Sequence, residues 1–157
     1  LPDNIKTKLK GTLDFDITTV LAASSGDGWF YAEPTVTHAS AVILGVTEDY
    51  LGPTTGAAAL ATGDKLKWIC IKHTGTVDGS IKTTKGIVFC LDAGTAAYNL
   101  ADGIFIAPGE MMVLKCPFTT VADLKAISVN IANGVPAAAT SSGDNVRLIV
   151  CGIAQNV

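Results

Sequence analysis

Few side chains in this chain of 157 residues are suited to catalysis or metal binding, and only two are histidines, His38 and His73. Cys70 and His73 lie three positions apart, a spacing that zinc ligands often have. Both belong to an apolar run typical of a β-strand, however, and residues i and i+3 of a strand point to opposite faces. No second pair of ligands follows. The sequence therefore predicts no metal site and no cofactor, with His73 at the rim of the fold.

Carboxylates and nucleophiles also lack the partners that catalysis requires. Asp14 and Asp16 would share one face of a strand, whereas a glycosidase needs two carboxylates that converge across a cleft. No Gly-x-Ser-x-Gly motif or phosphate-binding loop is present, and no serine or cysteine has a convincing histidine partner. We therefore expect no catalytic residues, and a protein that is not an enzyme.

A Pro-Gly pair, Pro108-Gly109, separates the apolar runs 104–107 and 111–114. Some metal-binding barrel enzymes carry a similar pair beside their histidine ligands, but no histidine follows position 73 here. Proline favours the second position of a type II turn, and glycine tolerates the positive φ of the third. The stretch therefore predicts a corner between two strands.

The four cysteines are Cys70, Cys90, Cys116 and Cys151, and each lies in or at the end of an apolar run. None belongs to a C-x-x-C pair. Because a free cysteine behaves as a small hydrophobic residue, we expect four buried free thiols. Disulfides are the main alternative, and assembly in a reducing compartment fits the first interpretation.

The composition is apolar for a soluble domain, with 48% hydrophobic and 16% charged residues against roughly 25% charged in a typical domain. No apolar run approaches the ~18 residues that indicate a membrane span, so no membrane partner is expected. The net charge is −3 and no basic stripe is present, which argues against nucleic acid as a partner. The excess apolar surface must be buried in the fold or against other subunits.

Short runs rich in Ile, Val, Thr and aromatic residues alternate with Gly, Asp, Asn and Pro, which is typical of strands and turns. The predicted fold is all-β, an antiparallel β-sandwich or jelly-roll-like single domain over residues 17–157. Residues 1–16 are expected to form an extended N-terminal arm or a first strand. The expected strands lie near 5–14, 17–23, 28–37, 41–46, 65–74, 85–92, 103–107, 110–116, 124–132 and 145–154.

Turn residues and the alternation of side chains add detail to this fold. Asp78-Gly79 predicts a hairpin between the strands at 65–74 and 85–92, because Asp-Gly tolerates the positive φ of a tight turn. The strand at 127–131 alternates, with Ile127, Val129 and Ile131 expected in the core and Ser128 and Asn130 in water.

Four of the predicted strands are apolar on both faces, whereas a two-sheet sandwich buries only one face of each strand. The second face needs a cover, which a loop, the N-terminal arm or a neighbouring subunit could supply. Together with the low charge content, this pattern favours an oligomer with a sheet interface. The four runs are 68–71, 87–91, 111–114 and 148–151.

Four segments occur in an order that resembles small β-rich virion proteins of tailed bacteriophages, above all capsid decoration (cement) proteins. They are Gly-Trp-Phe-Tyr at 28–31, Trp-Ile-Cys-Ile-Lys-His-Thr-Gly-Thr at 68–76, Ile-Phe-Ile-Ala-Pro-Gly-Glu at 104–110 and Arg-Leu-Ile-Val at 147–150. The resemblance implies a sandwich or jelly roll, often trimeric, that bridges major capsid proteins on the outer capsid surface. It implies no cofactor and no active site.

Under this interpretation the partners are the major capsid protein and further copies of this chain in a homotrimer. The protein would assemble in the host cytoplasm and reside on the outer surface of the virion, and Lys6, Lys8 and Lys10 could meet an acidic capsid surface. The residues expected at the capsid or subunit interface are Ile5, Leu9, Leu13, Phe15, Trp29, Tyr31, Met111 and Val113.

A carbohydrate-binding or receptor-binding β-sandwich of a phage tail or fibre is the alternative. It would use Trp29 and Tyr31 as a stacking platform, since aromatic faces pack on sugars as well as on proteins.

Overall fold

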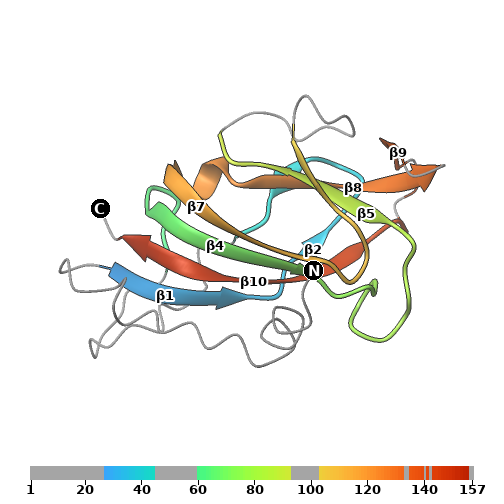
Figure 1. The fold of residues 1–157 in the computed structure, drawn as a ribbon, viewed down its shortest axis with the longest axis horizontal. Helices are drawn as coiled ribbons and strands as arrows, with labels where there is room; N and C mark the ends of the chain where they lie inside the picture. Colours follow the sequence, from blue (N-terminus) through green and yellow to red (C-terminus); the bar gives the residue numbers. More distant parts are fainter. Residues whose placement is uncertain are drawn as a thin grey trace, which may run out of the picture.

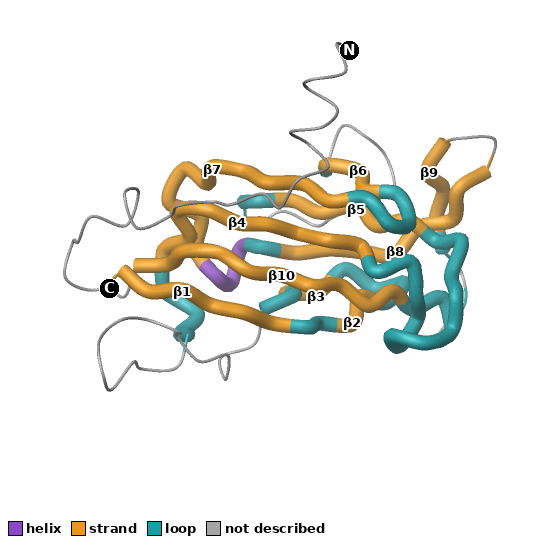
Figure 2. Tube along the Cα trace, turned by 60° about the horizontal axis from the view of Figure 1, so that its bottom comes forward, coloured by secondary structure: helices purple, strands orange, loops and turns teal. Residues whose placement is uncertain are grey.

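The computed structural model describes residues 27–44, 60–92, 103–132, 135–139, 141 and 143–155, and these form two antiparallel β-sheets that pack face to face (Figures 1 and 2). The first sheet has the order β1-β10-β4-β7, with β2 also paired to β10. Its strands are β1 (Asp27–Ala32), β2 (Thr35–Val36), β4 (Lys65–His73), β7 (Met111–Thr120) and β10 (Val146–Gln155).

The second sheet has the order β3-β8-β5-β6, with β9 also paired to β8. Among the eight main strands, each strand except β6 lies in the other sheet from the strand before it. This order is that of an eight-stranded jelly roll with β2 and β9 as short additions. The predicted all-β sandwich is therefore confirmed. The strands of the second sheet are β3 (Ala41–Val42), β5 (Gly86–Cys90), β6 (Ile104–Ile106), β8 (Lys125–Ala132) and β9 (Val135–Ala138), and the 3-10 turn η1 (Val121–Asp123) precedes β8.

Proline explains two departures from the predicted strands. The strand expected at 28–37 is divided into β1 and β2, because Pro34 lies between them and has no amide to donate to a ladder. The strand expected at 110–116 extends to Thr120, and its pairing with β4 shifts register between Leu66 and Trp68. Pro117 lies within that irregularity, where a missing amide is tolerated. The expected strands at 5–14 and 17–23 and the arm at 1–16 lie outside the described residues.

The two predicted turns have different outcomes. The corner at Pro108-Gly109 is confirmed: Gly109 has a φ of 83°, and the amide of Glu110 donates to the carbonyl of Ala107 at 3.1 Å. The hairpin predicted at Asp78-Gly79 is wrong, because β4 and β5 belong to different sheets. The turn instead closes a small excursion within the crossover, held by an isolated bridge between Thr76 and Lys82.

The core fills the space between the sheets. Ile69, Ile71 and Leu148 contribute from the first sheet, and Ile87 and Phe89 face them from the second. Large buried side chains of this kind, each worth about 1.5–3 kcal/mol of transfer free energy, are what the alternating apolar pattern of a sandwich provides.

The predicted orientation of β8 is wrong. Ser128 is fully buried opposite Ile87, on the face that looks into the sandwich, and its Oγ has no hydrogen-bond partner among the described residues. Ala126, on the same face, pairs with Phe89. Small residues here leave room for the bulky side chains of β5. The outer face of β8 is also covered, since Val129 is fully buried there without belonging to the central core.

The strands that are apolar on both faces are covered in two ways. All five residues of β5 are buried, and the ring of Phe105 lies over Gly86 on the outer face, so closely that a Cβ at position 86 would meet it at 2.4 Å. The chain thus covers this part of the second sheet itself. The outer face of the first sheet keeps exposed apolar side chains, and it carries the features described below.

Candidate functional site

The outer face of the first sheet carries rows of side chains that cross its strands. One row runs through Tyr31, Cys151, Cys70 and Val113, which are directly opposite one another on β1, β10, β4 and β7. The next row runs through Ile149, Lys72 and Met111. Side chains opposite one another in an antiparallel sheet share a face, so these rows form one surface, which we call the β1-β7 face.

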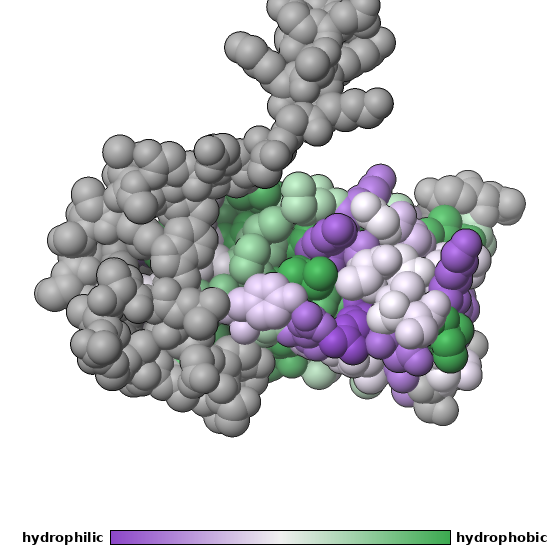
Figure 3. Space-filling model, turned by 90° about the horizontal axis from the view of Figure 1, so that it is seen from below, coloured by the Kyte–Doolittle hydropathy of each residue, from purple (hydrophilic) through white to green (hydrophobic). Residues whose placement is uncertain are grey.

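Three residues of the β1-β7 face are large, apolar and exposed. Tyr31 is 44% exposed, Met111 52% and Val113 38%. Cys70, Ile149 and Cys151 lie between them and are half-buried. Figure 3 looks onto this side of the molecule, where hydrophobic surface borders a hydrophilic cluster. The face therefore combines an apolar centre with a polar margin.

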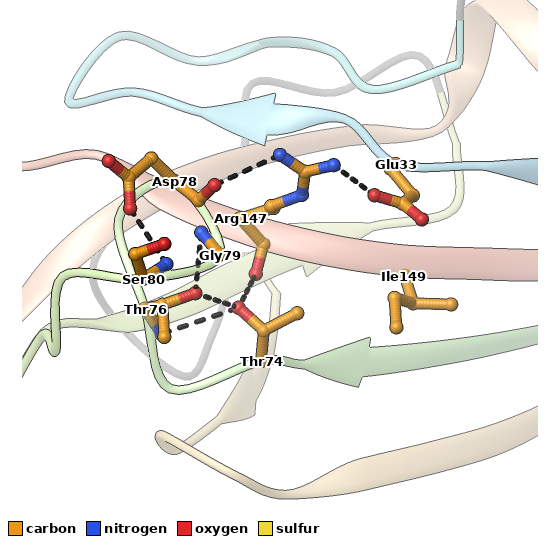
Figure 4. Close-up of a pocket in the computed structure, with 8 residues that line it drawn as sticks. All are labelled: Glu33, Thr74, Thr76, Asp78, Gly79, Ser80, Arg147 and Ile149. Carbon is orange, nitrogen blue, oxygen red and sulfur yellow. Dashed lines mark hydrogen bonds and ion pairs between the residues drawn. The ribbon is translucent and has the colours of Figure 1, made fainter.

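The polar margin contains an open depression of about 400 Å³ (Figure 4). Arg147 lies at its centre, between two carboxylate-bearing segments: its guanidinium forms an ion pair with Glu33 and donates through Nη1 to the backbone carbonyl of Asp78 at 3.0 Å. The Tyr31 hydroxyl donates to Oε1 of Glu33 at 2.5 Å. The lining residues are Glu33, Thr74, Thr76, Asp78, Gly79, Ser80, Arg147 and Ile149.

Hydroxyl and backbone groups hold the far wall of the depression. Thr74 Oγ1 lies 2.8 Å from the carbonyl oxygen of Arg147, to which it donates, and 2.7 Å from Thr76 Oγ1. Thr76 Oγ1 in turn accepts from the Gly79 amide at 3.0 Å, and Gly79 has a φ of 101°. The carboxylate of Asp78 accepts from the amides of Ser80 and Ile81, each at 2.9 Å. Most polar groups of the wall are thus engaged with one another.

These contacts fix the charge state of the site. The Tyr31 hydroxyl and the Arg147 guanidinium hold the pKa of Glu33 below its usual range, and the hydrogen bond to Glu33 raises the pKa of Tyr31. The backbone amides of Ile81 and Ser80 lower the pKa of Asp78. Both carboxylates are therefore ionised at neutral pH and are poorly matched to a general acid. The depression is suited to hydrogen bonding with a polar group.

His73 is not at the rim of the fold but fully buried. Its Nδ1 accepts from the Gly75 amide at 2.9 Å, and its Nε2 lies 2.9 Å from the carbonyl oxygen of Lys85, to which it donates. Burial lowers the pKa of the imidazole. A neutral ring with both nitrogens occupied joins the end of β4 to the segment before β5, so His73 has a structural role.

Comparisons with known proteins identify no relative. No family model, no curated protein sequence and no solved structure gives a significant match to this chain. Within the described ranges no cluster of three or more potential metal-ligating side chains occurs. Among the same residues no helix is long and apolar enough to cross a membrane.

The residues predicted for an interface are placed as follows. Tyr31, Met111 and Val113 lie together on the β1-β7 face. Trp29 lies two residues before Tyr31 on β1, opposite Ile153, so its backbone position belongs to the same face. Four further residues lie outside the described part of the chain: Ile5, Leu9, Leu13 and Phe15.

Sequence reasoning missed the polar margin. Arg147 is the only arginine of the chain, and it lies within an otherwise apolar strand, which is a signal that could have drawn attention to it. Its partners Glu33 and Asp78 come from distant segments. Their convergence depends on the jelly-roll crossovers, which local patterns do not specify.

Proposed function

We propose that this protein is a structural virion protein, which binds the outer surface of a phage capsid as a homotrimer and stabilises it by bridging major capsid protein subunits. The β1-β7 face carries the proposal, because Tyr31, Met111 and Val113 expose apolar surface on one sheet face. Exposed apolar patches rimmed by polar groups mark sites of protein-protein contact.

The architecture supports the same function by analogy. Jelly rolls recur in viral capsid and lectin domains, although a fold alone does not establish an activity. A cement protein needs a rigid scaffold and an adhesive surface, and no proton-transfer site.

In this proposal two parts of the chain make different contacts. The β1-β7 face joins copies of the chain into the trimer, and residues 1–16 attach the trimer to neighbouring capsid subunits. Anchors at Ile5, Leu9 and Leu13, with Lys6, Lys8 and Lys10 toward an acidic capsid surface, would suit such an arm. Removal of residues 1–16 should then abolish capsid attachment while the domain still folds and assembles.

The oligomeric state tests the trimer. We expect wild-type protein to have the mass of a trimer in size-exclusion chromatography with light scattering, and the Met111→Glu/Val113→Glu double variant to have that of a monomer. Ile81→Glu is the matched control, because Ile81 is 62% exposed but lies in the crossover excursion and not on the β1-β7 face. A double variant that assembles like the wild type would refute the proposed interface.

Capsid attachment is tested separately. The wild-type protein, the Ile81→Glu control and the chain lacking residues 1–16 are mixed with undecorated phage capsids and sedimented. We expect the first two to cosediment and the truncated chain to remain in the supernatant. Normal attachment of the truncated chain would reject the arm, and failure of all three to bind would reject the capsid function.

A carbohydrate-binding or receptor-binding module of a tail or fibre is the second candidate. One observation favours it: the exposed ring of Tyr31 stands beside the polar depression, and its hydroxyl contacts Glu33 in the wall. Stacking on an aromatic ring beside charged hydrogen-bonding groups is a common way to hold a sugar. Glycan-array binding that Trp29→Ala and Tyr31→Ala both abolish would favour this candidate over the capsid function.

A further inference from the structure

Two of the four cysteines face each other across neighbouring strands. Cys70 of β4 and Cys151 of β10 are directly opposite in the register, at the centre of the β1-β7 face, and both are half-buried. The other two, Cys90 and Cys116, are 7% and 4% exposed and lie on β5 and β7. The pair thus differs from the remaining cysteines in both neighbourhood and access.

The backbone hydrogen bonds show which kind of cross-strand pair this is. The amide of Leu148 donates to the carbonyl of Pro34, and the amide of Arg147 donates to the carbonyl of Thr76 on the opposite side of β10. Alternate amides of a strand point the same way, so the amide of Cys151 faces β4, as that of Arg147 does. Cys70 and Cys151 therefore form a hydrogen-bonded pair, for which the Cα atoms are about 5.5 Å apart.

The Cα spacing is compatible with a disulfide, but the bond would draw the two strands together locally. Bridged cysteines usually have Cα atoms about 4.4–6.8 Å apart, and the side chains of this pair share one face of the sheet. The Cβ atoms of hydrogen-bonded pairs are about 5.5 Å apart, however, and a disulfide brings them to about 3.5–4.5 Å. The sheet must pinch locally, which makes the bond easier to reduce than an unstrained structural disulfide.

We propose that Cys70 and Cys151 are a reversible dithiol site, which a small-molecule disulfide such as oxidised glutathione converts to an intramolecular disulfide. The Cys151 thiolate attacks one sulfur of glutathione disulfide, and the first glutathione leaves as a thiolate. Cys70 then loses its proton to solvent and attacks the Cys151 sulfur, displacing the second glutathione. The two protein thiols lose two electrons and two protons in total, and two molecules of glutathione are formed.

The electrostatics of the pair support this order of events. The Cys70 thiol hydrogen bonds to Cys151 and lowers the pKa of that thiol to about 7, while the same contact raises the pKa of Cys70. Burial raises the pKa of Cys116 to about 11, which leaves it largely protonated at neutral pH. Since the thiolate is the attacking species, Cys151 should react first and Cys116 should not react.

Oxidation of this site would respond to the compartment. In a reducing cytosol the pair remains a dithiol, and in an oxidising environment it closes and ties β4 to β10 at the centre of the sheet. Tyr31 and Val113 flank the pair in the same row, so the bond would lie in the interface of the proposed trimer. The access of glutathione to the pair therefore rests on the proposed function, and the experiment below tests the dithiol site and the trimer interface separately.

The test is performed on the whole folded chain. Protein at pH 8 is incubated with oxidised glutathione, free thiols are alkylated in denaturant, and the peptides are mapped by mass spectrometry. We expect a bond between Cys70 and Cys151, two alkylated cysteines at positions 90 and 116, and full reversal by excess reduced glutathione. Three results would overturn the proposal: four alkylatable thiols, a bond between a different pair, or glutathione retained on Cys151. Each must be seen both in the wild-type chain and in the Met111→Glu/Val113→Glu chain.

Single variants and a disassembled variant complete the design. Cys70→Ser should accumulate a mixed disulfide of glutathione at Cys151, whose thiolate the serine hydroxyl can still stabilise. At pH 6, Cys151→Ser should react about tenfold more slowly than Cys70→Ser, because burial keeps Cys70 protonated and this outweighs the higher nucleophilicity of its thiolate. Equal rates for the two variants would contradict the assigned order. The Met111→Glu/Val113→Glu chain is oxidised in parallel: closure in this chain alone supports both the dithiol site and a covered face, whereas closure in neither chain rejects the dithiol site whatever the oligomeric state.

Discussion

Gly152 of β10 provides the sharpest test of how closely β10 packs against β1 and β4, its two neighbours in the first sheet. A Cβ built at this position would lie 2.2 Å from the backbone oxygen of Trp68 and 2.8 Å from the ring of Phe30. Ordinary contacts begin near 3.4 Å, so a methyl group would overlap a backbone atom that the β4-β10 ladder holds in place. We expect Gly152→Ala to destabilise the protein by about 3 kcal/mol, the upper part of the range for overpacked cores.

Thermal unfolding followed by circular dichroism measures this effect. For a domain of this size, 1 kcal/mol corresponds to about 2–4 °C, so the Tm of Gly152→Ala should fall by about 6–12 °C. Gly63→Ala is the matched control, because a Cβ at position 63 would have no atom within 4 Å and the backbone there needs no positive φ. That variant should keep the wild-type Tm or exceed it slightly. Two alanine variants with equal Tm values would refute the packing argument.

Three further predictions concern the core, a turn and a buried histidine. Phe89→Ala should cost about 3–5 kcal/mol in urea unfolding, because the ring is fully buried between the sheets. Gly109→Ala should cost about 1–2 kcal/mol in the same assay, because the φ of 83° is unfavourable for a side chain. Burial lowers the pKa of His73, so the unfolded chain binds more protons near and below its ordinary pKa of about 6.5. The free energy of unfolding should therefore be highest above that pH and should decrease as the pH falls toward the lowered pKa of His73. His73→Gln should flatten this part of the profile of unfolding free energy against pH.

The fold class was predictable because it depends on a local signal. Alternating apolar residues and turn residues placed most of the described strands within a few positions, and the Pro-Gly pair predicted the positive φ of Gly109. The crossover at Asp78-Gly79 was not predictable in this way. A local turn can join two strands of one sheet or carry the chain to the other sheet, and only long-range packing decides between them.

The prediction of which face of β8 points into the core was wrong for a related reason. A serine in an alternating strand suggests a solvent-facing position, but both faces of β8 are covered, so polarity no longer indicates which face is inside. Side-chain volume determines which face of β8 points inward, because the small side chains of Ala126 and Ser128 accommodate Ile87 and Phe89. The candidate site was partly visible: Tyr31, Met111 and Val113 were predicted as contacts, whereas Arg147 and Glu33 meet only through the fold.

The first sheet offers a partner two different surfaces, its face and its edge at β7, and the sequence favours the face. An edge strand can pair with another chain through its unused amides and carbonyls. Here Pro117 removes one amide and lies in the irregular part of the ladder, while Lys115 places an exposed charge on the strand. Both features discourage strand addition. The apolar side chains of Met111 and Val113 are exposed on the face of the sheet, so the proposed association uses side-chain packing rather than strand pairing.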